Sequence, residues 1–361
     1  MRFIKTIVFL FGMICMTACV MQKSNNDIKI ACNLPLTGNF SIYGESIKDG
    51  MMLAYDDLKD SLNKYELNFV FDIQDNKSMA KDAQSILRKQ IAQCDVYVAG
   101  IAQPLYSILP QIGSMDTPCF AWGFEEYVLK ECNNTYRTWV NLDAEAYNYI
   151  QYIKKMGSKK VVLIRPQTVG CQLQYENKII PFLQSEGIEY VTMVYENDKK
   201  DFKDITLKCK EEKADLYVIN GFDFHLKELL KQFRINNIMT DVNTYWSLDM
   251  LDAAKNIDSI ILEGVRVTAP LFLIQPNLDW IKRFEMKYNR KPRYTDAYAY
   301  DMLYTLFYAY KQSKKQETKW QNELKNISFQ GITGPMKFNN NRDLEYNLKT
   351  CLYHNGKLSE E

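Results

Sequence analysis

The sequence predicts an α/β fold with two lobes, each built on a parallel sheet. Short apolar runs alternate with amphipathic stretches between residues 66 and 142, and the same alternation repeats between residues 143 and 267. Strands that alternate with helices pair in parallel through right-handed crossovers, so each block predicts one Rossmann-like lobe. The chain without its leader is long enough for about two domains of ordinary size.

The first 18 residues have the pattern of an export signal and are not expected to belong to the fold. Arg2 and Lys5 precede an apolar run over residues 7–16, which is too short to span a bilayer because a helix needs about 20 residues to do so. The small residues Thr17 and Ala18 before Cys19 resemble a lipobox. The resemblance implies that residues 1–18 are a lipoprotein signal peptide and that Cys19 is lipidated. The protein would then be exported and anchored to the cell envelope, on the periplasmic side where there are two membranes. An ordinary secretory signal with an incidental cysteine is the alternative.

A tether, a strand, an open loop and a helix are expected next. Residues 19–27 are mostly polar and are predicted to be the tether. Residues 28–32 are a short apolar run, and apolar residues recur at helical spacing from Glu45 onward. In an open α/β sheet, ligands bind beyond the carboxyl end of such a strand. The loop between strand and helix, which contains Tyr43, is therefore expected at the binding site.

The remaining elements follow from the same periodicities. The first block predicts strands at residues 67–73, 95–100 and 117–121, and helices at residues 78–92 and 106–114. The second block predicts strands at residues 160–164, 190–194, 216–220 and 260–268, and helices at residues 144–156, 175–185, 202–212 and 224–233. Two further helices are predicted at residues 277–288 and 294–314.

Composition and motifs argue against several classes of function. The formal net charge of +1 provides no field that would attract nucleic acid. The two histidines, His225 and His354, are expected at the surface, and neither a Ser-His-Asp arrangement nor an HExxH motif is possible. Neither a GxGxxG nor a GxxxxGK[ST] motif occurs, so nucleotide binding has no support. The sequence therefore predicts no catalytic residue, no cofactor, no metal and no nucleic-acid partner.

Cysteine usage leaves the redox state open. Cys15 lies in the predicted signal, and seven other cysteines follow Cys19, without any CxxC pair. An odd number in an exported chain leaves at least one thiol free. Two pairings are open, Cys119 with Cys132 and Cys32 with Cys94. Alternatively, all seven are small buried apolar residues.

Three segments together resemble the type I periplasmic solute-binding proteins of the leucine/isoleucine/valine-binding family. They are PLTG at residues 35–38 with Gly44, Gly50 and Ala54, YAYDM at residues 298–302, and GITGPMKFN at residues 331–339. They occur in the family's order and bracket nearly all of the chain after the leader. The resemblance implies three crossings between the lobes, near residues 142–143, 267–269 and 333–335. Lobe 1 would contain residues 28–142 and 269–334, and lobe 2 residues 143–268 and 335–361.

The resemblance also implies a function. The protein would be a lipid-anchored extracytoplasmic solute-binding protein that captures a small polar ligand, amino-acid-like or similar, between its lobes. An ABC-type permease would be its partner, and it would touch the membrane through the lipid anchor alone. The alternative from another class is an envelope lipoprotein that keeps the fold without a ligand and acts by contact with another protein.

The ligand contacts that the resemblance implies are loop residues that follow strands. They are Tyr43, Gln103, Ala121, Trp122, Gly123, Phe222, Asp241, Asn243 and Tyr245. Tyr43 keeps the family's spacing before Gly44, and Asp241 and Asn243 are the candidates to meet a ligand ammonium. The family's hydroxyl residues that hold a ligand carboxylate are absent from the turns at residues 102–106 and 120–124, and Pro104 has no N–H. Backbone groups and Gln103 could still hold a carboxylate there. Trp122, Phe222, Tyr245 and Trp246 could form an aromatic cleft, or part of them could be core.

Overall fold

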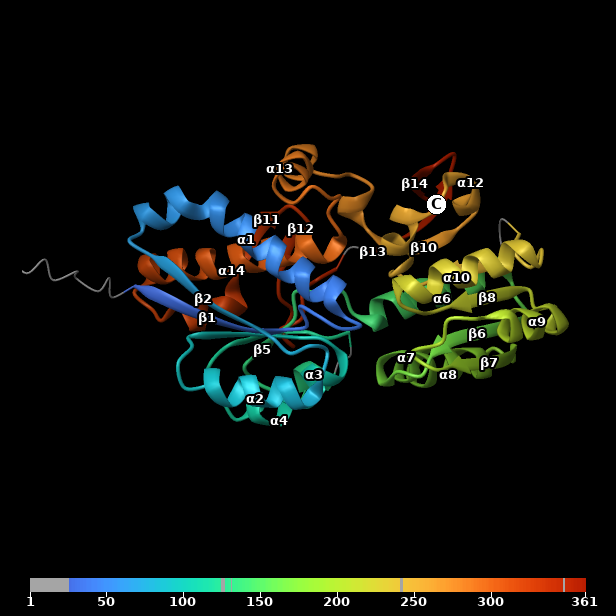
Figure 1. Cartoon of the computed structure of the whole chain (residues 1–361), viewed down its shortest axis with the longest axis horizontal. Coiled ribbons are helices and arrows are strands. Elements are labelled where there is room, and N and C mark those ends of the chain that lie inside the picture. The colour runs from blue at the N-terminus through green and yellow to red at the C-terminus, as the bar shows by residue number, and fades with distance from the viewer. Residues whose placement is uncertain (1–25, 125–126, 131, 241–242, 347) are drawn as a thin grey trace, which may run out of the picture.

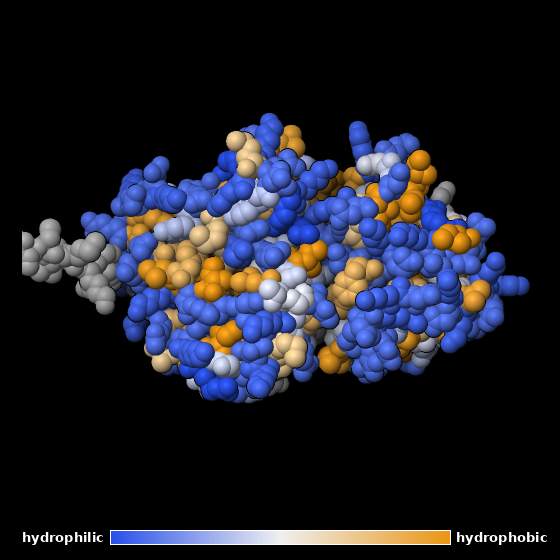
Figure 2. Space-filling model, in the orientation of Figure 1, coloured by the Kyte–Doolittle hydropathy of each residue, from blue (hydrophilic) through white to orange (hydrophobic). Residues whose placement is uncertain are grey.

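The computed structural model describes residues 26–124, 127–130, 132–240, 243–346 and 348–361. Cys19, the predicted signal peptide and nearly all of the predicted tether lie outside the described residues, as does Asp241. Two separate sheets lie along the long axis of the molecule, each covered by helices (Figure 1). The face in Figure 2 is mostly hydrophilic, with hydrophobic side chains in small groups, mainly over the first lobe. No helix of the described residues is long and apolar enough to cross a membrane.

The first lobe is built on a parallel sheet with the strand order β2-β1-β3-β4-β5. Its strands are β1 (Asp27–Leu34), β2 (Asn68–Asp75), β3 (Val96–Gly100), β4 (Cys119–Trp122) and β5 (Thr135–Tyr136). Because β1 pairs with β2 on one side and with β3 on the other, the strand order reverses at β1. Such a switch point opens a crevice beyond the carboxyl ends of the strands.

Helices cover both faces of this sheet (Figure 1). One face carries α1 (Ser41–Lys64) and α14 (Tyr294–Gln316), and the other carries α2 (Ala80–Gln90), α3 (Ala102–Tyr106) and α4 (Leu109–Gly113). The short helix α5 (Tyr127–Lys130) follows β4. α1 and α14 pack closely because Gly50 lies at their contact, where an added Cβ would be 2.1 Å from the carbonyl oxygen of Asp296.

The second lobe is built on a mixed sheet with the order β14-β13-β10-β9-β8-β6-β7. Its strands are β6 (Lys160–Pro166), β7 (Glu189–Tyr195), β8 (Leu216–Ile219), β9 (Thr244–Trp246), β10 (Arg266–Pro270), β13 (Leu348–His354) and β14 (Lys357–Glu360). The strands β6 to β10 are parallel, whereas β13 and β14 pair antiparallel at one edge. One face packs on α6 (Leu142–Met156), a π-helical turn (Tyr175–Ile179) and α8 (Ile180–Ser185), and the other on α9 (Lys203–Glu212) and α10 (Asp223–Ile235).

Short elements complete the fold. They are α7 (Val169–Gln174), α11 (Met250–Ala253), a 3-10 turn (Ala254–Asn256), α12 (Ser259–Leu262), a 3-10 turn (Leu271–Leu273), α13 (Leu278–Tyr288), α15 (Trp320–Glu323), a 3-10 turn (Leu324–Asn326) and the hairpin of β11 (Ser328–Gly331) and β12 (Gly334–Lys337). The turn of this hairpin is fixed by Asp301 of α14, which accepts hydrogen bonds from the N–H groups of Ile332 and Thr333. Two of the three sequence motifs therefore contact each other directly.

The chain passes three times between the lobes, and the third crossing lies later than expected. The first two occur between β5 and α6 and between β10 and α13. After the hairpin, the chain stays with the first lobe because Asp343 forms a bridge and a buried ion pair with Arg137. The third crossing therefore lies between Leu344 and Leu348 instead of near residues 333–335.

The predicted alternation of strands and helices is present, with differences at short elements. Residues 260–268, expected as one strand, contain part of α12, a turn at Gly264 and the start of β10. The expectation of a surface position for His225 is wrong, because its side chain is fully buried and its Nε2 lies 3.0 Å from the carbonyl oxygen of Asn197. Burial lowers the pKa of His225 to about 4. Cys32, Cys94 and Cys119 are free thiols, so neither of the two considered disulfides is formed.

Candidate functional site

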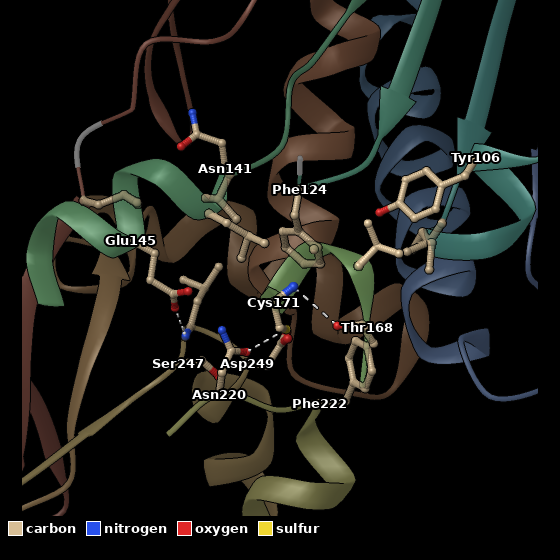
Figure 3. A pocket seen from close by; sticks show the side chains of 18 residues that line it. Tyr106, Phe124, Asn141, Glu145, Thr168, Cys171, Asn220, Phe222, Ser247 and Asp249 are labelled. Carbon is tan, nitrogen blue, oxygen red and sulfur yellow. Dashed lines mark hydrogen bonds between the residues drawn. The ribbon is translucent and has the colours of Figure 1, made fainter. Parts of the chain in front are cut away.

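A cavity of about 50 Å³ lies between the two lobes, beyond the carboxyl ends of β3, β6, β8 and β9 (Figure 3). The first lobe and the first crossing contribute Ile101, Ala102, Tyr106, Phe124, Val140, Asn141 and Leu142. The second lobe contributes Glu145, Thr168, Val169, Gly170, Cys171, Asn220, Phe222, Ser247, Leu248, Asp249 and Leu348. Most of these side chains are apolar. Among the described residues, no lysine, arginine or histidine lines the cavity.

Glu145 is the first of two carboxylates at the cavity. Asn141 caps α6 by accepting a hydrogen bond of 2.6 Å from the N–H of Ala144, which places Glu145 in the first turn. Its Oε1 accepts from the N–H of Leu248 at 2.6 Å and its Oε2 from Nε2 of Gln174 at 2.9 Å. Burial raises the pKa of Glu145 above the usual value of a glutamate. Glu145 thus holds the loop after β9 against the start of α6.

Asp249, the second carboxylate, joins the two lobes. Its Oδ1 accepts hydrogen bonds from Oη of Tyr43 at 3.0 Å and from Oη of Tyr294 at 2.8 Å. Both tyrosines belong to the first lobe, whereas Asp249 follows β9 of the second. No residue of the described chain donates a hydrogen bond to Oδ2. Burial, followed by the nearby charge of Asp252, raises the pKa of Asp249 well above its usual range, although the Tyr294 hydrogen bond opposes the shift.

The other polar side chains of the second lobe at the cavity form hydrogen bonds with neighbouring side chains or with the backbone. Asn220 donates from Nδ2 to Oε1 of Gln174 at 2.7 Å and accepts at Oδ1 from Sγ of Cys171 at 3.4 Å. Thr168 caps α7 by accepting from the N–H of Cys171, and Ser247 donates to the carbonyl oxygen of Gly221 at 3.3 Å. These bonds fix the ends of β6, β8 and β9 relative to each other, which makes this wall preformed.

Aromatic side chains close the remaining space between the lobes. Phe40 of the first lobe contacts Phe222 of the second edge to face, with ring centroids 5.4 Å apart. On the side of the first lobe, the ring of Trp139 packs against two other aromatic rings. Its centroid is 4.1 Å from that of Phe124 and 5.9 Å from that of Tyr43. Aromatic pairs with ring centroids about 4.5–7 Å apart, such as Phe40 with Phe222, stabilise a contact beyond their buried area. The two lobes are therefore in direct contact beside the cavity.

The predicted ligand contacts are only partly brought together. Of the predicted residues that the structure describes, Phe222 lines the cavity, and Tyr43 reaches it through Asp249. Gln103 is exposed on α3, and Gly123 offers its carbonyl oxygen to Nη1 of Arg137 at 3.4 Å. Ala121 and Trp122 are buried in β4 within the first lobe.

Asn243 and Tyr245 lie away from the cavity. Asn243 is at the amino end of β9, where its side chain bonds the backbone of Thr240 and Ile238. Tyr245 is fully buried, with its hydroxyl near those of Thr268 and Thr350. The polar residues that line the cavity were not predicted; they are Tyr106, Asn141, Glu145, Thr168, Asn220, Ser247 and Asp249. For three of them the available signal was position, because Asn220 and Ser247 directly follow strands and Asp249 comes two residues after Ser247.

Comparisons with known proteins agree with this architecture. A family model described as "Periplasmic binding protein" matches residues 27–350. The chain is 26% identical over 205 residues to the Leu/Ile/Val-binding protein BraC3 of Rhizobium johnstonii, a match that covers 54% of this chain and 55% of that protein. The chain thus matches about half the length of this curated relative.

Solved structures show the same fold at low identity. The branched-chain amino acid transporter substrate-binding protein LivJ from Streptococcus pneumoniae, solved with isoleucine, has a TM-score of 0.77 at 16% identity and covers 92% of this chain and 98% of its own. A solute-binding protein of an ABC transporter from Rhodopseudomonas palustris was solved with 3,4-dihydroxybenzoic acid. It has a TM-score of 0.78 at 16% identity, and the match covers 92% of this chain and 95% of that protein. The leucine-binding protein LivK from Thermotoga maritima has a TM-score of 0.75 at 18% identity and covers 92% and 97%.

Proposed function

Because the chain belongs to the periplasmic binding protein family, we propose that it captures a small ligand in the cavity between its two lobes. The observation that carries this proposal is the position of the cavity: residues of both lobes line it, beyond the carboxyl ends of parallel strands in both sheets. Ligands of open α/β sheets bind at such places. A ligand that touches both lobes stabilises their closed arrangement because it binds that arrangement better than the open one.

The walls of the cavity favour a small ligand with an apolar body. Ile101, Val140 and Leu248 are apolar, and Phe222 adds an aromatic surface. Relatives are named for leucine, isoleucine and valine, and solved neighbours hold isoleucine or 3,4-dihydroxybenzoic acid. The proposed ligand is small and polar, amino-acid-like or similar. We assign no catalytic role to the chain.

Export and transport are further parts of the proposal. The pattern before Cys19 supports a signal peptide over residues 1–18, a lipid on Cys19 and a tether over residues 19–27 that holds the two lobes at the envelope. The family supports an ABC-type permease as the partner that receives the ligand. The proposed lobes follow the sheets, with residues 28–142 and 269–346 in lobe 1 and the rest of the folded chain in lobe 2.

One group of contacts favours a second function, in which the fold acts by contact with another protein. Asp249 binds Tyr43 and Tyr294 directly, and Phe40 contacts Phe222, so side chains alone can hold the lobes together. The hydroxyl residues expected for a ligand carboxylate are also absent from the turns after β3 and β4. An envelope lipoprotein of this kind would present a closed surface to its partner.

Native mass spectrometry of the purified protein separates the two functions. Solute binding predicts that the protein from its own host carries a small-molecule mass that denaturation removes and that Phe222→Ala abolishes. Bare protein from its own host and from a heterologous host would instead favour the protein-contact function.

A further inference from the structure

We infer that the ligand of this cavity is a small amine without a carboxylate, and that Asp249 receives its ammonium group. The inference rests on the proposed solute-binding function and names its ligand class. Three features of the described residues carry it: the sign of the charges at the cavity, the unused oxygen of Asp249, and the orientation of the groups that would meet a carboxylate.

The cavity has two carboxyl groups, whose only charged form is negative. Glu145 and Asp249 line it, and no described lysine, arginine or histidine does. Asp252 lies close enough to Asp249 to act on its charge, and its own partner is Lys255 at 2.7 Å, outside the cavity. Burial already disfavours the negative form of both groups, and a ligand carboxylate would add another negative charge where low dielectric strengthens repulsion. An ammonium group would be attracted by the same charges.

Asp249 has an acceptor that the protein does not use. Its side chain is 94% buried, since its exposed fraction is 6%. Oδ1 accepts two hydrogen bonds from tyrosines, whereas Oδ2 accepts none from the described chain. A carboxylate has room for about four hydrogen bonds, and a buried charge is costly unless it is paired. An ammonium group has three N–H donors and a positive charge, so it supplies what this site lacks.

The side chains that the family resemblance places near a ligand carboxylate are turned elsewhere. Gln103 is exposed on the surface of α3, and Pro104, which follows it, has no N–H to donate. Trp122 is the last residue of β4, and its ring packs on Trp139 with 5.6 Å between ring centroids. The hydroxyl of Ser247 is already donated to Gly221. The cavity thus has acceptors for a cation but lacks charged donors for an anion.

The volume sets the size of the amine. A space of about 50 Å³ holds roughly three to five water-sized groups, at about 10–15 Å³ for each. The apolar walls select a branched hydrocarbon body over a polar one. Isobutylamine, the amine that valine would give without its carboxylate, has this size and shape and serves as the probe.

Isothermal titration calorimetry on the intact protein tests the inference with four compounds of matched shape. They are isobutylamine, isobutanol, isovalerate and valine. Isobutylamine is expected to bind at least about tenfold more tightly than each of the others, as befits a charge-assisted hydrogen bond. Asp249→Asn should weaken isobutylamine at least about tenfold, because the amide keeps an acceptor for the tyrosines but loses the charge. Asp60→Asn, an exposed position on α1, should leave its Kd unchanged.

The titrations can overturn the inferred ligand class without overturning solute binding itself. Binding of valine or isovalerate as tightly as isobutylamine would overturn the inference and leave solute binding standing. Absence of binding by all four compounds would overturn the inference, and the mass-spectrometric search for a retained ligand would then decide the function separately. The comparison of the four compounds on the wild type remains decisive even where Asp249→Asn fails to fold.

Discussion

Tyr43 of the first lobe and Asp249 of the second are joined across the cleft by a hydrogen bond of 3.0 Å between Oη and Oδ1. Tyr294 donates to the same oxygen at 2.8 Å. One carboxylate oxygen therefore ties α1 and α14 to the loop after β9. Because Asp249 also lines the cavity, the contact that closes the lobes and the wall that meets the ligand share a residue.

The double variant Tyr43→Phe with Tyr294→Phe should open the lobes. It removes both donors to Asp249, and each of these hydrogen bonds contributes about 0.5–1.5 kcal/mol when Asp249 is neutral and about 1.5–3 kcal/mol when it is ionised. Small-angle X-ray scattering should show a larger radius of gyration. Tyr288→Phe is the matched control, because Tyr288 donates to Asp49 within the first lobe. An unchanged radius in the double variant would show that these bonds do not hold the lobes together.

Asp301 should make the protein less stable as the pH rises from about 4 to 6. Burial raises its pKa from 3.8 to about 6, against the opposing hydrogen bonds from Thr333 and Ile332. The folded state therefore binds the proton more tightly than the unfolded state, and stability present below pH 4 is lost as the pH passes the folded value. The effect amounts to about 3 kcal/mol.

Urea unfolding at several pH values isolates this contribution. The free energy of unfolding of the wild type minus that of Asp301→Asn should fall by about 2 kcal/mol between pH 4 and pH 7. For Asp60→Asn, the free energy of unfolding should instead change with pH in the same way as that of the wild type. Parallel curves for wild type and Asp301→Asn would contradict the assignment.

Gly50→Ala should destabilise the protein, against the usual effect of this substitution in a helix. Alanine ordinarily stabilises a helix interior by about 0.5–1 kcal/mol over glycine. Here the added Cβ would lie 2.1 Å from the carbonyl oxygen of Asp296, so α1 and α14 would have to move apart. We expect a loss of about 1–3 kcal/mol in urea unfolding, and little change for Asp60→Ala on the exposed side of α1. A variant more stable than the wild type would refute the close packing.

Cys19→Ala should leave an unprocessed or soluble precursor, because the lipid would have no thiol to attach to. The measurement is incorporation of labelled palmitate together with fractionation of membranes. Cys15→Ala, within the predicted signal, is the control and should still be labelled. A Cys19→Ala protein that is labelled and sediments with membranes would exclude Cys19 as the anchor.

The fold was predictable because its signals are local. Buried strands are continuous apolar runs, and the helices between them are amphipathic. The three motifs act in the packing of the fold. Gly50 of the first motif lets α1 and α14 pack closely, and Asp301 of the second motif accepts hydrogen bonds from the turn in the third. The motifs therefore identify the architecture without identifying the ligand.

The site was less predictable because it depends on short elements and distant partners. β9 has three residues (Thr244–Trp246) and no periodic signal, so the expected acidic contact was placed before this strand instead of after it, where Asp249 lies. Glu145 is in the first turn of a helix, a common place for an exposed acid. Its burial depends on Leu248 and Gln174, which are remote in sequence.

The central claim, ligand capture between the lobes, is tested most directly by a thermal-shift panel of amines, amino acids, short peptides, sugars, purines and aromatic acids. Phe222, just before α10, lines the cavity and is 8% exposed, whereas Phe224 in the first turn of α10 is 44% exposed, so Phe222→Ala and Phe224→Ala form a matched pair. A ligand at a hundred times its Kd stabilises the protein by about 2.7 kcal/mol, or roughly 4 °C in Tm for a chain of this length. We predict at least one compound that raises the Tm of the wild type and of Phe224→Ala but not of Phe222→Ala. A panel without any shift, or a shift that Phe222→Ala retains in full, would contradict ligand capture at this cavity.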